Sequence, residues 1–221
     1  MKAFFPTFIL LNMCDAFRYL PYTQIRPLFL DMYHMINSKK EVSLEHIVPQ
    51  CIYKKKQPEL SRDMHNIMMY PNLLNSHRSN YRFSNELVLD DTTTILSNNG
   101  EKSLYTGPFN HIGICLKSNK KRYFYPRPFY RGKIARSCMY MAMTYPVYRD
   151  KIFNEVIDPY VVLTWHHEHP VSGFELRKNN AILDLQGNEN IYVSKPENLL
   201  KDMESYLGKR INIYHDYKWH S

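Results

Sequence analysis

The 221-residue sequence lacks several features that mark well-known protein classes. No apolar run reaches the roughly 18 residues that a membrane-spanning helix needs, so we expect a soluble protein with no membrane partner. No internal repeat and no low-complexity block interrupts the chain. A single domain with one core is therefore the expected organisation.

Cysteine is also scarce. The four cysteines are far apart and form no C-x-x-C pair; they are Cys14, Cys51, Cys115 and Cys138. This spacing indicates neither a thiolate zinc site nor a dense disulfide framework. It leaves the redox compartment open.

The composition is that of a globular protein, and basic residues outnumber acidic ones. Hydrophobic residues make up 44% and aromatic residues 14% of the chain. Lys and Arg number 29 against 21 Asp and Glu, which gives a net charge of +8. A polyanionic partner such as nucleic acid suits this charge, although charge alone is weak support for one.

The first residues permit two interpretations. Lys2 followed by the apolar stretch 3–11 resembles the start of a secretory signal, whereas Pro6 and a poor cleavage site argue against one. Secretion or export to a periplasm therefore stays open. We divide the chain into a signal-like or helical segment at 1–19, a domain at 20–207 and a tail at 208–221.

Local patterns predict the elements of the first half. Residues 15–37 favour two short helices, because Pro21 and Pro27 interrupt the helical spacing. Residues 41–49 alternate and end at a proline, which predicts a short strand with His46 at its end. A helix is expected to start near Ser61 or Asp63, to end at Pro71, and to carry an outward-facing Asn66.

The second half is predicted to be mostly helical. Helices are expected over 130–148, 160–169, 174–185 and 196–207, with the first as the central core helix. Residues 90–108 resemble an exposed loop or irregular hairpin. The aromatic run 123–125 is either a packed strand, which we favour, or a stacking platform for bases.

One constellation suits phosphodiester hydrolysis, which needs an activated water and a cation. Glu45 and His46 are adjacent, so on a strand their side chains diverge, and one can ligate a metal while the other faces the water. Asn66 adds an amide oxygen. A set of oxygen ligands suits Mg²⁺ better than Zn²⁺.

Several ordered blocks resemble the bacterial endonuclease I family of non-specific nucleases. They are the stretches 44–50, 63–66 and 78–83 with Asn75, then 125–126, 131–136 and 139–141, and finally Trp165, 170–171, Glu175, Arg177, Asn179 and 186–190. Their order and spacing both agree with the family. Departures are Lys133, Ile191 and a shorter stretch after the His46 motif.

The resemblance implies an α+β fold, mostly helical around a ββα-metal (His-Me finger) motif with a small antiparallel sheet. It further implies Mg²⁺-dependent cleavage of DNA and RNA that leaves a 5′-phosphate, with Mn²⁺ or Ca²⁺ as substitutes. By position, His46 matches the general base, and Glu45 and Asn66 match the metal ligands.

Other polar residues have alternative roles. Arg78 is equally suited to a phosphate contact and to a structural ion pair, and Arg131 is undecided between the same roles. His65 and Asn75 are expected to support the site. Arg136 is expected to form an internal salt bridge, and no metal is expected at the histidine-rich tract 166–169. The alternative function is nucleic-acid binding without turnover.

Overall fold

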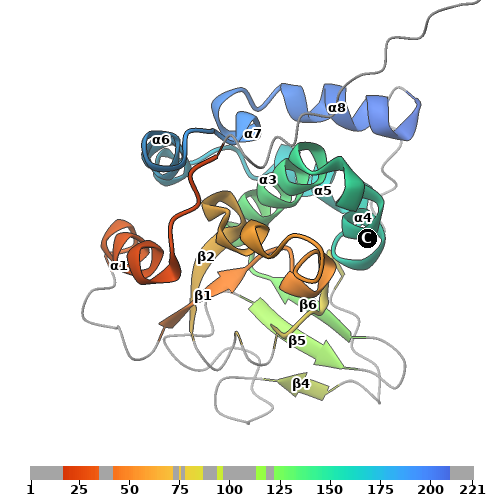
Figure 1. Cartoon of the computed structure of the whole chain (residues 1–221). Coiled ribbons are helices and arrows are strands. Elements are labelled where there is room, and N and C mark those ends of the chain that lie inside the picture. The colour runs from red at the N-terminus through yellow and green to blue at the C-terminus, as the bar shows by residue number, and fades with distance from the viewer. Residues whose placement is uncertain are drawn as a thin grey trace, which may run out of the picture.

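A computed structural model describes residues 17–34, 42–71, 75, 78–86, 94–96, 113–117 and 122–209. These residues form the α+β, mostly helical arrangement that the sequence predicts, with two small sheets below a group of helices (Figure 1). The helices are α1 (Tyr22–Met32), α3 (Pro128–Thr144), α4 (Arg149–Glu155), α5 (Pro159–Glu168), α6 (Gly173–Gln186), α7 (Ile191–Ser194) and α8 (Asn198–Leu207). The 3₁₀ turns are η3 (Gln50–Ile52), η4 (Pro58–Arg62), η5 (Met64–Asn66) and η6 (Pro146–Tyr148).

The strands form two separate sheets. They are β1 (Val42–His46), β2 (Ile67–Pro71), β3 (Arg82–Phe83), β4 (Thr94–Leu96), β5 (Gly113–Lys117) and β6 (Arg122–Pro126). β1 and β2 are antiparallel, with His46 opposite Ile67. The second sheet has the order β3-β6-β5-β4, and only its β3–β6 pair is parallel. Of the predicted loop at 90–108, β4 is the part that the structure describes.

The helix predicted to start near Ser61 is wrong, because its apolar half is the strand β2. Ile67 and Met69 join one hydrophobic cluster, whereas Met68 and Tyr70 join the other. A strand buried on both faces reads as a continuous apolar run without the period of two that identifies a half-buried strand. Asp63 caps the short turn η5 by accepting from the backbone of His65, so no α-helix begins there.

The two short helices predicted for 15–37 are, in the described residues, one helix. α1 spans Tyr22–Met32 and contains Pro27. Proline removes one backbone hydrogen bond, to the carbonyl of Thr23. Both residues are exposed and lie on the solvent-facing side of α1. The opposite face of α1, with Ile25 and Phe29, is fully buried against β2 and α6 residues, and this burial stabilises the continuous helix.

α3 is the central core helix, as predicted. It is buried along most of its length and packs against α5, and α8 lies across the top of this pair (Figure 1). The helices predicted at 160–169, 174–185 and 196–207 are confirmed as α5, α6 and α8. Within the described part of the chain, no helix is both long and apolar enough to cross a bilayer. The segment 1–16 and the tail from 210 onward lie outside the described residues.

Candidate active site around His46

His46 ends β1, and the Nε2 edge of its ring faces protein atoms. Nε2 lies 2.7 Å from the Ser61 carbonyl oxygen and 2.9 Å from the Tyr22 hydroxyl oxygen. A carbonyl oxygen only accepts, so Nε2 must carry the proton in the neutral ring. The lone pair then lies on Nδ1, the nitrogen that would act as a base. Burial lowers the pKa of His46, which keeps the ring neutral at neutral pH.

Glu45 points to the other side of β1, as alternation on a strand requires. It is buried and forms an ion pair with Arg78. Burial raises the pKa of the Glu45 carboxyl, and the Arg78 charge opposes that rise. The carboxylate and the imidazole therefore lie on opposite faces of the end of β1. The carboxylate is paired with the Arg78 charge, whereas the imidazole faces the neutral Ser61 carbonyl.

Arg78 is 1% exposed and binds the backbone at the end of β1. Its Nη1 donates to the carbonyl of His46 at 2.7 Å, and its Nη2 donates to that of Ile47 at 2.6 Å. The guanidinium also lies over the Phe83 ring, 4.6 Å from the centroid. Of the two roles open from the sequence, the structure shows the ion pair. A phosphate contact would require the guanidinium to leave these partners.

Asn66 does not face outward, which corrects the prediction. It is 0% exposed at the end of η5. Its Oδ1 accepts from the backbone N–H of Val48 at 2.7 Å, and its Nδ2 donates to the Val48 carbonyl and the Tyr53 hydroxyl, both at 3.0 Å. The amide thus joins the loop after β1 to the turn before β2. Its oxygen is committed to the backbone.

Asn75 lies beside β1 and contacts Ser43 and Leu44. Its backbone is helical, and its carbonyl accepts from Ser79 N. Its Nδ2 donates to the Ser43 hydroxyl at 2.9 Å and to the Leu44 carbonyl at 3.3 Å. The side chain is half-buried beside β1, one turn away from Arg78. An amide therefore stands beside β1, the strand that carries the carboxylate and the histidine.

Asp63 is the centre of a buried network that sequence reasoning missed. Its carboxylate accepts from Tyr140 OH at 2.9 Å, from Gln186 Nε2 at 3.1 Å, from the His65 backbone and from Tyr145 OH. These donors fix η5, the turn directly before β2. The side-chain partners lie on α3, directly after it and on α6, far along the chain, so no local pattern could identify them.

His65 belongs to the same buried network. Its Nε2 lies 3.1 Å from the carbonyl oxygen of Asn188, and its own carbonyl accepts from Ser137 Oγ at 2.6 Å. Burial lowers its pKa. Gln186 Oε1 accepts from Met64 N at 3.0 Å. The Gln-Gly-Asn stretch at 186–188 therefore anchors the turn that leads into β2.

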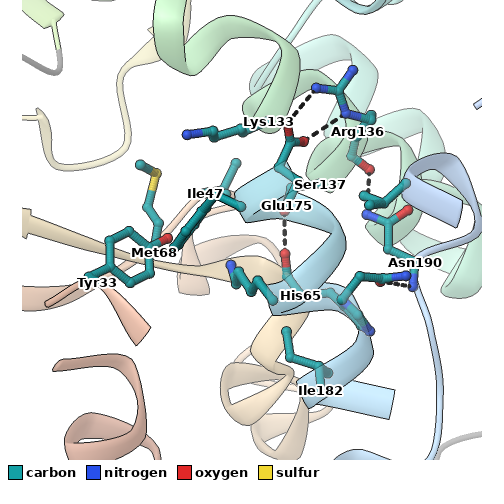
Figure 2. Close-up of a pocket in the computed structure, with 14 residues that line it drawn as sticks. Tyr33, Ile47, His65, Met68, Lys133, Arg136, Ser137, Glu175, Ile182 and Asn190 are labelled. Carbon is teal, nitrogen blue, oxygen red and sulfur yellow. Dashed lines mark hydrogen bonds and ion pairs between the residues drawn. The ribbon is translucent and has the colours of Figure 1, made fainter. Parts of the chain in front are cut away.

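Arg131 and Arg136 both lie inside the protein. Arg131 donates from Nε to the Pro126 carbonyl at 3.0 Å, and its guanidinium stacks over the Tyr125 ring at 4.7 Å. Arg136 forms the internal salt bridge that the sequence predicts, with Nε 2.8 Å from Oε1 of Glu175 (Figure 2). In the described residues, no group of three or more His, Cys, Asp or Glu side chains could hold a metal, and this includes the tract 166–169.

A cavity of about 40 Å³ lies between β2, α3 and α6 (Figure 2). His46 does not line it. Lys178 does, and it donates from Nζ to the Ile67 carbonyl at 2.6 Å. Burial lowers the pKa of Lys178 to about 7 from its ordinary 10.5. The ammonium is therefore charged in the folded protein only at the cost of desolvation.

Lys178→Met should stabilise the protein relative to wild type more at pH 6 than at pH 10. Between pH 7 and 10.5 the unfolded chain holds a proton on Lys178 that the folded chain lacks. Raising the pH through this window therefore favours folded wild type, and the variant loses that dependence. Urea denaturation of both proteins at the two pH values measures the difference. An equal offset at both pH values would contradict the lowered pKa of Lys178.

The protein has an α+β fold in which the antiparallel strands β1 and β2 are followed by Asn75 and Arg78 in helical conformation. Glu45 and His46 lie at the end of β1. A family model described as Endonuclease I matches residues 33–197. The chain belongs to the endonuclease I family.

Three curated relatives have names that state an activity. An extracellular deoxyribonuclease of Aeromonas hydrophila is 28% identical over 62% of this chain and 51% of its own length. A periplasmic deoxyribonuclease of the same organism is 26% identical over 72% of the chain and 65% of its own length. Endonuclease-1 of Buchnera aphidicola is 22% identical over 71% of the chain and 63% of its own length. The chain spans between half and two thirds of these relatives.

Proposed function

We propose that this protein is a divalent-cation-dependent endonuclease that hydrolyses phosphodiester bonds of DNA and RNA, leaves a 5′-phosphate and has little sequence preference. The observation that carries the proposal is the fixed His46 ring: the Ser61 carbonyl holds the Nε2 proton, so Nδ1 is the base. Membership of the endonuclease I family and the deoxyribonuclease names of its relatives support the same reaction.

His46 takes a proton from water in this proposal, while Arg78 keeps the strand end in place through the His46 carbonyl. Glu45 supplies a carboxylate ligand for the cation. A site with one carboxylate, one amide and waters suits Mg²⁺, with Mn²⁺ or Ca²⁺ as substitutes. When bound, such an ion neutralises charge that develops on the phosphoryl group.

Of the two asparagines, Asn75 fits the amide ligand better than Asn66. Asn66 is fully buried and its oxygen already accepts from Val48 N, whereas Asn75 is half-buried beside β1. We therefore propose Glu45 and Asn75 as the protein ligands. Asn66 keeps the backbone around them in shape.

Asn66→Ala and Asn75→Ala should separate these two roles. Asn66→Ala leaves the buried N–H of Val48 without its partner and removes one of the two donors to the Val48 carbonyl. A buried polar group left without a partner costs about 1–3 kcal/mol. Asn75→Ala should fold with near-wild-type stability and lose at least about tenfold in activity, which is the least that disturbing a metal site costs. Urea denaturation and plasmid nicking across a Mg²⁺ titration measure both. A well-folded but inactive Asn66→Ala would return the ligand role to Asn66.

The direct test of the function is plasmid nicking and RNA degradation with Mg²⁺ and with EDTA. Cation-dependent cleavage of both substrates supports the proposal. A well-folded protein that shifts DNA in a gel but cuts neither substrate would instead favour nucleic-acid binding without turnover. Cleavage that survives EDTA would contradict the cation requirement.

A further inference from the structure

α1 contributes a side chain to the candidate active site although it precedes the residues that match the family. Tyr22 opens α1, whereas the family match starts at residue 33. The Tyr22 hydroxyl donates to the Ser61 carbonyl at 2.7 Å and lies 2.9 Å from His46 Nε2. Its ring meets the imidazole edge to face, with centroids 6.0 Å apart and an interplanar angle of 87°. Tyr22 therefore contacts His46 through both its ring and its hydroxyl.

Gln50 is the second contact on the same edge of the imidazole. Its Oε1 accepts from Lys54 Nζ at 3.1 Å, so its amide nitrogen faces the opposite way. That nitrogen donates to the Tyr22 hydroxyl at 3.0 Å and lies 3.2 Å from His46 Nε2. A donor thus stands beside Nε2, and the tyrosine oxygen accepts its hydrogen bond.

We propose that Tyr22 is a positioning residue for His46, which holds the ring with its proton on Nε2 and its lone pair on Nδ1. Without the tyrosine oxygen, the Gln50 amide nitrogen still lies 3.2 Å from His46 Nε2, which can accept its hydrogen bond. Nε2 accepts only when it carries no proton, and in that tautomer Nδ1 is protonated and is no base. The proposal rests on the proposed role of His46 as the general base.

Tyr22→Phe tests the hydroxyl while it keeps the ring. We expect kcat to fall about fivefold to tenfold, which is the effect of one hydrogen bond, with KM for DNA changed less than twofold. Tyr22→Phe combined with Gln50→Leu removes the competing donor and should recover part of the lost kcat. Nitrogen-15 NMR of neutral His46 should show an Nε2–H ring in wild type and an added share of Nδ1–H in Tyr22→Phe.

Tyr160→Phe is the matched control, because Tyr160 is a partly exposed tyrosine on α5 outside the candidate site. It should leave kcat and the His46 tautomer unchanged. Wild-type kcat and tautomer in Tyr22→Phe would overturn the proposal, as would a double variant that recovers nothing. A His46→Ala variant that still cleaves DNA would instead overturn the proposed function. The NMR comparison of wild type and Tyr22→Phe would still test whether Tyr22 controls the His46 tautomer.

Discussion

His46→Ala is expected to lower kcat for plasmid nicking by about 100-fold to 10,000-fold, which is the usual contribution of a positioned general base. The ring is held by Ser61 and Tyr22 with its lone pair on Nδ1, and no alanine atom can replace that acceptor. Binding of DNA should change little, because phosphate contacts come from basic side chains rather than from this neutral ring. Nicking rates at saturating plasmid and gel-shift titrations measure the two effects.

His167→Ala is the matched control for loss of an imidazole, because His167 is exposed near the end of α5. It should nick plasmid at the wild-type rate. If His46→Ala retained more than about a tenth of the wild-type kcat while folded, the general base would have to be another group.

Glu175→Ala should cost about 3–5 kcal/mol of unfolding free energy, because it leaves the Arg136 charge buried without its partner. The pair is bidentate, with a second contact of 2.9 Å between Arg136 Nη2 and Glu175 Oε2, and Arg136 is 1% exposed. Glu175 also closes the capping box of α6 with Ser172. Total stabilities of single domains are about 5–15 kcal/mol, so the loss should be visible in the urea midpoint.

Glu155→Ala, at an exposed position on α4, is the control and should change stability by less than about 0.5 kcal/mol. Arg136→Met combined with Glu175→Leu should regain part of the loss, because it replaces the buried charges by apolar groups. A cost below about 1 kcal/mol for Glu175→Ala would mean that water reaches Arg136.

Much of the helical framework could be predicted from the sequence because its signals are local. Proline and the apolar spacing bounded the central helix α3, and the Pro170 and Gly173 turn separated α5 from α6. The strand that carries His46 was equally clear from its alternation and closing proline. These patterns depend on neighbours within a few residues, which a sequence displays directly.

β2 and α1 could not be predicted in the same way. The apolar run of β2 is buried on both faces, so its pattern has no period that separates strand from helix. α1 tolerates Pro27 because tertiary burial of Ile25 and Phe29 outweighs one lost hydrogen bond. In both elements, tertiary packing determined the secondary structure, because the local sequence pattern was compatible with more than one.

The sequence by itself determined the family resemblance and the adjacency of Glu45 and His46, which places a carboxylate and an imidazole on opposite sides of one strand. The tertiary structure decided which asparagine lies near them and which nitrogen of His46 holds its proton. It also placed Arg78 in the interior and Tyr22 against His46. Each of these depends on contacts between residues 15 to 33 positions apart, and such contacts form only when the chain has folded.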